Sequence, residues 1–300
     1  MGTSEGLYGL EPVGDGPPYQ GFRLARVDPL TLTVRRSAVI PGDPGGVSVD
    51  AGTVYVAARR TPAVLRFRVG SLTRLAPWRD PVARLLGPLA ITRFGLWVAD
   101  AAGVTRLLGD NQQGGHSTER WTGTPLMQTT YDDQNLISNG FWVVAPDPAG
   151  CPTLYFATGP SGLEGHPAPV LHPAACELGF TALAAGARVA WISSPTGSLA
   201  VTHLVTSNAT TGGWTATEGP SGSNQITPSV AGSISFLSDP QGLACYDGRG
   251  QLLARTTVRA DGPVSIVQAR GREFVVFDQG NIGTAVGPRV QPFTPAHACR

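Results

Sequence analysis

Charged side chains interrupt the apolar pattern of this chain at a few places, and these are the places where chemistry could occur. The residues that we single out as candidate ligand contacts are Arg59, Arg60, Asp100, Tyr131, Asp132, Asp133 and Asp278. Carboxylates that are brought together can bind a hard cation through oxygen, or can act as acid and base. The candidate catalytic group within this set consists of Asp132 or Asp133 together with Asp100 and Arg59.

Each of these acids also has a purely structural interpretation. An Asp before Gly or Pro is a common turn residue whose carboxylate accepts hydrogen bonds from its own backbone. This interpretation is favoured for Asp147 and Asp239, which both precede Pro. Asp132 and Asp133 follow the polar run 128–130, where the other repeats have apolar residues, although an exposed loop would look the same. The sequence therefore leaves a site and a set of turns as alternatives.

Other common catalytic and cofactor patterns are missing from the sequence. The five histidines show neither HxH nor HExxH spacing, and no serine lies in a GxSxG elbow. No glycine-rich phosphate-binding motif precedes a helical pattern. We therefore expect no resident cofactor and assign no metal ligands, although the carboxylates would accommodate a divalent cation such as calcium.

The elements that must position these residues are short strands. The segment 45–77 contains four apolar runs separated by Gly, Asp, Pro and Ser, and each run is too short for a helix. Four strands that are joined by tight turns form one antiparallel meander, which is the unit of a β-propeller blade. Similar units recur about every 40 residues, a period typical of propellers. The sequence predicts an all-β chain that forms a single β-propeller domain of four-stranded blades over residues 1–300.

Seven units can be traced along the chain, and six blades remain the alternative. The approximate boundaries are 1–44, 45–87, 88–124, 125–178, 179–224, 225–262 and 263–300. The first unit shows strand patterns at 7–10, 22–27 and 32–35, so it lacks an obvious innermost strand. We expect the C-terminal tail to supply that strand and close the ring. We also expect the Ala-rich run 182–187 to be an inner strand.

Three segments carry a resemblance to a known class of repeats. They read VDPLTLTV (27–34), GGVSVDAGTVYVAA (45–58) and GLWVADAAGVTRL (95–107). These segments resemble the NHL- and YVTN-type propeller repeats of bacterial proteins over about the first third of the chain. The resemblance implies the propeller fold, a bacterial origin and ligand binding on one face of the ring. The metal and catalytic motifs of gluconolactonase-like and virginiamycin B lyase-like propellers have no counterpart here.

Cysteine usage and charge limit the partners and the compartment. Four cysteines without a CxxC pair favour two disulfides, Cys151–Cys176 and Cys245–Cys299, with four free thiols as the alternative. A net charge of +1 provides no strong field for nucleic acid. No apolar run is long enough to span a membrane. We expect a secreted or cell-surface monomer whose leader has been removed, with a cytoplasmic protein as the alternative.

Two functional hypotheses follow. The first is a non-catalytic propeller that binds a small molecule, a glycan or a protein at the mouth of the central channel. The second is a channel-mouth enzyme, namely a hydrolase, lyase or cyclase that uses the clustered carboxylates and Arg59, with or without a divalent metal. The weak catalytic motifs and the turn-like setting of most acids favour the first.

Overall fold

Twenty-seven strands and the turns that join them make up the part of the chain that can be described. The computed structural model describes residues 2–3, 6–14, 19–50, 52–58, 63–79, 87–100, 103–118, 125–131, 137–146, 148–149, 152–158, 182–185, 189–196, 199–207, 214–223, 227–231, 234–239, 242–247, 251–256, 264–269, 272–277, 289–293 and 299. Within these ranges every regular element is a strand, and no helix capable of crossing a membrane occurs. The all-β expectation is therefore confirmed.

The strands form consecutive antiparallel sheets that we number in chain order. The first sheet contains β1 (Gly2–Thr3), β2 (Gly6–Val13), β3 (Gly21–Val27), β4 (Val34–Arg36) and β5 (Ile40–Pro41). The second contains β6 (Pro44–Asp50), β7 (Thr53–Ala58), β8 (Ala63–Arg68) and β9 (Arg74–Arg79). The third contains β10 (Leu89–Thr92), β11 (Gly95–Asp100), β12 (Gly103–Gly109) and β13 (Gln112–Thr118). The fourth contains β14 (Leu126–Tyr131), β15 (Ile137–Pro146) and β16 (Pro152–Thr158).

The remaining sheets continue the same order. The fifth contains β17 (Ala182–Ala185), β18 (Val189–Thr196), β19 (Leu199–Ser207) and β20 (Trp214–Ser223). The sixth contains β21 (Thr227–Ala231), β22 (Ile234–Asp239), β23 (Gly242–Tyr246) and β24 (Leu252–Thr256). The seventh contains β25 (Val264–Ala269), β26 (Arg272–Phe277) and β27 (Arg289–Phe293). Because these sheets are counted over the described residues alone, the number of blades in the complete ring stays a prediction.

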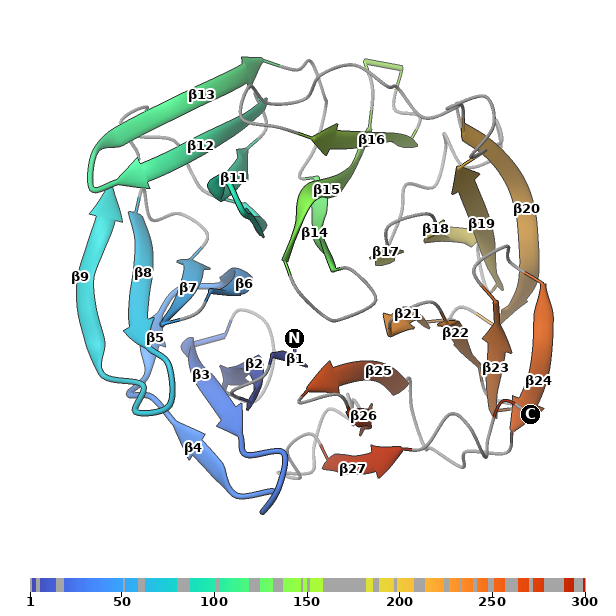
Figure 1. Ribbon diagram of the computed structural model, residues 1–300, viewed down its shortest axis with the longest axis horizontal. Coiled ribbons are helices and arrows are strands. Elements are labelled where there is room, and N and C mark those ends of the chain that lie inside the picture. The colour runs from blue at the N-terminus through green and yellow to red at the C-terminus, as the bar shows by residue number, and fades with distance from the viewer. Residues whose placement is uncertain are drawn as a thin grey trace.

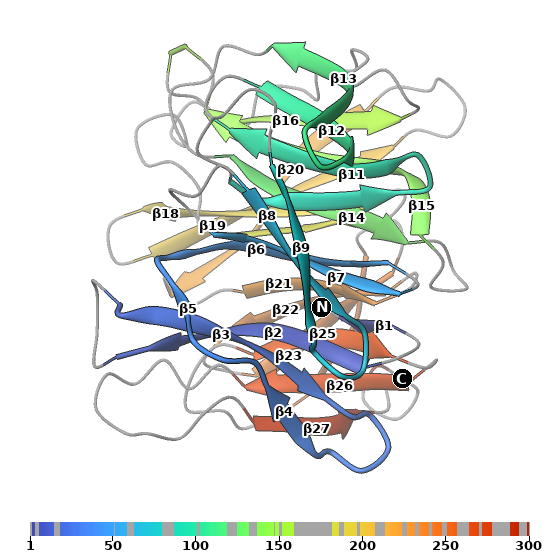
Figure 2. The ribbon, with the colours of Figure 1, turned by 90° about the vertical axis from the view of Figure 1, so that its left-hand side faces the viewer.

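The sheets stand around a central axis as the blades of a propeller (Figure 1), and their strands run across the ring's thickness (Figure 2). Neighbouring sheets touch through their innermost strands, for example β6 with β10 and β10 with β14. The alanine-rich strand β17 is first in its sheet, which confirms the expected inner strand. This arrangement leaves the connections between strands at the two faces of the ring.

The ring closes at the N-terminus, and our expectation for the C-terminal tail was wrong. The short strand β1 pairs with β2 through Gly2↔Leu7 and Thr3↔Gly6, and it lies against β25 of the seventh sheet. The C-terminal strand β27 instead pairs with β26 on the outer side of the seventh sheet. A two-residue strand of Gly and Thr carries no apolar pattern, so it could not be predicted from the sequence.

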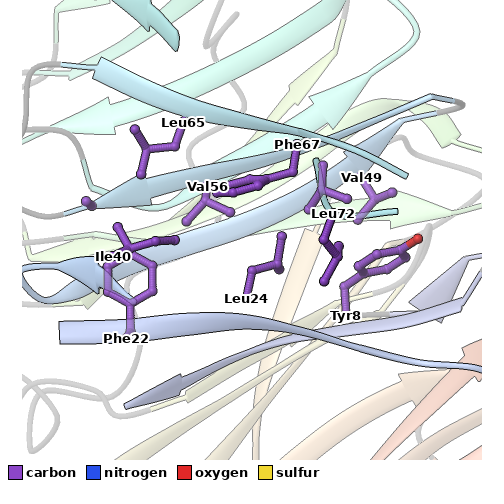
Figure 3. Close-up of a cluster of buried hydrophobic side chains, with 11 residues drawn as sticks. Tyr8, Phe22, Leu24, Ile40, Val49, Val56, Leu65, Phe67 and Leu72 are labelled. Carbon is purple, nitrogen blue, oxygen red and sulfur yellow. The ribbon is translucent and has the colours of Figure 1, made fainter. Parts of the chain in front are cut away.

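Apolar side chains fill the spaces between sheets. Between the first and second sheets, the buried cluster drawn in Figure 3 consists of Tyr8, Phe22, Leu24, Ile40, Val49, Val54, Val56, Ala58, Leu65, Phe67 and Leu72. Alternate residues of β2, β3, β7 and β8 supply most of it, because successive side chains of a strand point to opposite faces. Each large side chain that is buried in this way contributes about 1.5–3 kcal/mol.

Tryptophans of the second strands occupy matching places between sheets. Trp97 in β11 and Trp142 in β15 are both fully buried. The Trp97 ring lies 5.2 Å from the ring of Phe141, in a cluster that joins the third and fourth sheets. Trp78 of β9 is only partly buried, and it packs against the second–third sheet cluster.

A disulfide joins the end of the chain to the sixth sheet. Cys245 in β23 is bonded to Cys299, with 5.7 Å between their Cα atoms, and both residues are buried. The expected Cys245–Cys299 bond is therefore confirmed. The other expected pair, Cys151 and Cys176, lies outside the described residues.

Candidate ligand face

The second strands of the sheets determine which residues reach one face of the ring. Because consecutive sheets repeat the same strand order, the ends of β7, β11 and β26 all lie at the same face. Asp100 is the last residue of β11 and pairs with Gly103 of β12. β7 ends at Ala58 and β26 ends at Phe277, so Arg59 and Asp278 are the next residues in the chain. We call this face the second-strand face.

Small residues form a close-packed floor at this face, between the second and third sheets. A Cβ added to Gly45 would lie 3.0 Å from the carbonyl oxygen of Ala57 and 3.2 Å from that of Gly87. A Cβ on Gly46 would lie 3.1 Å from the amide nitrogen of Leu89. Larger side chains would therefore push the two inner strands apart.

Backbone hydrogen bonds of the two residues before β10 extend the same floor. The amide of Gly87 donates to the carbonyl of Ala99 at 2.7 Å, and the amide of Ala99 donates to the carbonyl of Pro88 at 3.1 Å. Ala57, Ala58 and Ala99 are almost fully buried beside these groups. Ala99 makes both hydrogen bonds, so the main chain is held in place directly before Asp100. Arg59 and Arg60 follow the matching end of β7.

The described strands do not bring Tyr131 and Asp100 together. Tyr131 is the last residue of β14, an innermost strand, and it pairs with Ile137 of β15. Innermost strands run antiparallel to second strands, so Tyr131 lies at the face opposite Asp100. A six-residue strand spans about 17 Å from first to last Cα. The connection that contains Asp132 and Asp133 therefore begins at the opposite face.

Several of the predicted contacts fall outside the described residues. Arg59, Arg60, Asp132, Asp133 and Asp278 belong to this group, and for Asp100 and Tyr131 the backbone alone is described. Their part in a site stays a prediction.

Glu11, another acid near the end of a second strand, has a structural partner. Its carboxylate accepts hydrogen bonds from Nε and Nη2 of Arg36 at 2.7 and 3.1 Å, which joins β2 to the outer strand β4. Asp28 likewise serves a turn, because its Oδ1 accepts hydrogen bonds from the amides of Leu30 and Thr31. These two bonds lower the pKa of Asp28 below its ordinary value.

Aromatic–arginine pairs at the sheet interfaces were missed in the sequence. In three successive sheets an arginine of the third strand stands directly opposite an aromatic residue of the second strand. The pairs are Tyr8↔Arg26, Tyr55↔Arg66 and Trp97↔Arg106. In the sequence, each of these aromatic residues is followed by an arginine in the next strand. Only the strand register shows that the two residues stand opposite each other.

Two of these arginines, Arg66 and Arg106, tie the outer strands to their sheets. The Arg66 guanidinium lies 4.3 Å from the centre of the Trp78 ring and donates to the carbonyl of Ala76 at 3.3 Å. Arg106 donates to the carbonyl of Gly114 at 3.2 Å, and its guanidinium lies 5.8 Å from the Trp97 ring. Burial raises the pKa of the Tyr55 hydroxyl, and Asp50 raises it further against the opposing effect of Arg66.

Within the described ranges no group of three or more His, Cys, Asp or Glu side chains could hold a metal ion. The groups whose hydrogen bonds are described above at the second-strand face are main-chain amides and carbonyls, and charged residues are next to them in sequence.

Comparison with known proteins shows the fold. No protein-family model and no curated protein sequence matches the chain. Among solved structures, hydrazine synthase of Kuenenia stuttgartiensis is similar with a TM-score of 0.61 and 11% identity, over 90% of this chain and 89% of that chain. The β-propeller domain of Cps50 (Swd1) from Myceliophteria thermophila is similar with a TM-score of 0.57 and 10% identity, over 98% of this chain and 96% of that chain. The chain has the β-propeller fold.

Proposed function

We propose that this propeller is a binding protein whose ligand contacts the second-strand face near the junction of the second and third sheets. One observation carries the proposal. The ends of β7 and β11 flank a close-packed floor of Gly45, Gly46 and Gly87, and unlike charges are next to that floor in sequence. Arg59 follows β7, and Asp100 ends β11.

The ligand that this arrangement suits is a polar small molecule or glycan with groups that pair with both charges. An arginine can bind a carboxylate through two hydrogen bonds, and an aspartate accepts hydrogen bonds from hydroxyl or ammonium groups. Buried strand interiors give such a site a rigid support, as is usual for sites on strand connections. The Cys245–Cys299 bond supports a location outside the cytoplasm, where disulfides persist.

The experiment is a thermal-shift screen with a panel of zwitterionic amino acids, sugar acids and neutral oligosaccharides. Compounds that raise the melting temperature are then titrated by calorimetry against Asp100→Asn and Arg59→Gln. Both variants remove a charge while keeping a polar side chain, so we expect the Kd of a true ligand to rise at least about tenfold, or 1.4 kcal/mol. The matched control is Asp132→Asn with Asp133→Asn, which changes acids beyond β14.

Two results would contradict the proposal. One is a panel without any hit. The other is a hit that tolerates Asp100→Asn and Arg59→Gln but is lost in the control, which would put the ligand at the opposite face. A separate titration with calcium addresses the enzyme alternative, since a stabilisation that depends on Asp100 would favour a cation-dependent site.

A further inference from the structure

Asp43 is an acid at the second-strand face, in the short connection between β5 and β6. β6 is antiparallel to β7, and Pro44 at its start pairs with Ala58 at the end of β7. The Cα atoms of paired residues in antiparallel strands lie about 4.5–5.5 Å apart. Asp43 and Arg59 are the next residues beyond this pair, on two neighbouring strands.

The close-packed floor connects Asp43 to Asp100 through the main chain. Gly45, two residues after Asp43, approaches Gly87 so closely that a Cβ on Gly45 would lie 3.2 Å from the Gly87 carbonyl oxygen. The Gly87 amide donates to the carbonyl of Ala99, the residue before Asp100. Asp43 therefore shares its floor with the charged residues to which we assign a ligand.

The carboxylate of Asp43 has neither a hydrogen-bond partner nor an ion-pair partner among the described residues, although the side chain is half-buried. Most of the other acids with described side chains bond within the protein, namely Glu11, Asp28, Asp110 and Asp247. Removing a charge from water is costly unless a partner compensates for the lost hydration. A ligand group that reaches Asp43 would supply that partner.

Asp28 provides an internal comparison, because Asp28 and Asp43 both precede a proline. Oδ1 of Asp28 accepts hydrogen bonds from the amides of Leu30 and Thr31, at 2.9 and 3.2 Å. Gly45 occupies the position after Asp43 that Leu30 occupies after Asp28, but within this described segment its amide makes no bond to the carboxylate. The turn interpretation of an aspartate before proline therefore holds for Asp28 and does not account for Asp43.

A positively charged ligand group suits an unpaired carboxylate best. A hydroxyl also donates to a carboxylate, but hydrogen bonds that involve charged groups are roughly twice as strong as neutral ones. Arg59 and Arg60 follow β7 and offer guanidinium groups to a carboxylate on the same ligand. A small molecule with one ammonium and one carboxylate would match both kinds of charge, whereas a sugar acid or a neutral sugar would leave Asp43 without a cation.

We propose that Asp43 is a specificity-determining residue of the second-strand face, and that its carboxylate binds the ammonium group of a zwitterionic small molecule. This inference rests on the function proposed above, and it narrows the ligand from polar molecules in general to amino-acid-like compounds. Arg59 pairs with the carboxylate of the same molecule. Asp100, at the end of β11, provides a second acid at the same face.

The test compares amino acids with their N-acetyl derivatives, in which a neutral amide replaces the ammonium. The amino acid that most raises the melting temperature of the full chain is titrated by calorimetry, as is its N-acetyl derivative. We expect the wild-type chain to bind the free amino acid at least about tenfold more tightly than the derivative. Asp43→Asn removes the charge and keeps the size of the side chain, so this preference should fall to about threefold or less.

Two further variants make the comparison specific. Asp43→Glu keeps the charge and should retain most of the preference for the free amino acid. Asp50→Asn is the matched control, because Asp50 is exposed at the other end of β6 and therefore lies at the opposite face of the ring. Removing the charge of Asp50 should leave the preference unchanged. The melting temperature of each variant without ligand verifies that it folds.

Several results would overturn this inference and leave the proposed function intact. One is a ligand that depends on Asp100 and Arg59 but whose preference for the ammonium is absent from the wild type or survives Asp43→Asn. Another is an equal loss of affinity for the amino acid and its derivative in Asp43→Asn, which would show that Asp43 holds Arg59 in position.

The identity of the hits provides a second check. Sugar acids or neutral oligosaccharides as the only hits would overturn the inference, because they carry no ammonium. A stabilisation by calcium that Asp43→Asn abolishes would also overturn it, since a metal ion would then be the partner of the carboxylate. A panel without any hit would instead contradict the proposed function itself, and the inference with it.

Discussion

The hydroxyl of Thr92 accepts two hydrogen bonds inside the third sheet. One comes from the Phe94 amide at 3.1 Å, and the other comes from Nε1 of Trp97, also at 3.1 Å. Thr92 is 4% exposed and Trp97 is fully buried, so water cannot replace either bond. This hydroxyl fixes the orientation of the ring that joins the third sheet to the fourth.

Replacing Thr92 with Val should therefore destabilise the protein. The shape is retained, but the Trp97 Nε1–H is left buried without an acceptor, which costs about 1–3 kcal/mol. Urea denaturation followed by tryptophan fluorescence measures the change. Thr92→Ser keeps the acceptor and loses a methyl group, so it should cost less than Thr92→Val. The reverse order would show that the bond contributes little.

At the scale of single residues, the sequence indicated which side chains are buried better than it indicated which side chains contact one another. Trp97 and Trp142 recur at matching positions of two second strands, and both are buried between sheets. The partner of Trp78 was not foreseen, because the Arg66 guanidinium reaches it across strands whose register the sequence does not contain. The bond between Glu11 and Arg36 of β4 likewise depends on the pairing of three strands, which the sequence does not contain.

The outer edge of the first sheet depends on one glycine. A Cβ on Gly21 of β3 would collide with the backbone carbonyl oxygen of Ile40, and it would also touch Val39 at 3.0 Å. Gly21 pairs with Pro41 of β5 at this point. The absence of a side chain thus lets β5 lie against β3 and keeps Ile40 in the core between the first two sheets.

We expect Gly21→Ala to cost about 1–3 kcal/mol, since the clash is with backbone and cannot be relieved by a rotamer change. Thermal or urea unfolding provides the measurement. Gly52→Ala is the matched control, because a Cβ there meets nothing within 4 Å, and it should leave stability nearly unchanged. Similar losses in both variants would mean that chain stiffness, rather than the approach of β5, is responsible.

At the scale of elements, apolar runs bounded by turn residues predicted the strands well. The Asp28–Pro29 turn and the inner position of β17 follow from local sequence. Local sequence could not identify β1, because two residues are too few to show periodicity, and it could not place β27 outside β26. The assignment of Asp100 and Tyr131 to opposite faces likewise depends on strand direction, which becomes clear only once each strand has its place in a sheet.

For the whole molecule, the Cys245–Cys299 bond links β23 of the sixth sheet to a residue 54 positions later, beyond the last strand of the seventh sheet. Such a link removes entropy from the unfolded chain, an effect worth about 2–4 kcal/mol. We expect Cys299→Ala to lower the free energy of unfolding by that amount under oxidising conditions. Non-reducing peptide mapping verifies the bond in the wild type. Wild-type protein treated with a reductant should match the variant, and a persistent difference would assign the loss to packing around Cys299.

The pairing of β1 with β2, against β25, has a consequence for how the chain is made. The first sheet is synthesised first, yet the apolar side chains of Leu7 and Val27 find Phe274 and Val267 only in the last sheet. At the usual rate of about 5–20 residues per second, a ribosome needs tens of seconds to deliver them. During that time one flank of the nascent chain stays open to water, and the final step joins segments from opposite ends of the polypeptide. Such distant contacts form slowly, so the ring is most vulnerable to aggregation immediately before its last strands emerge.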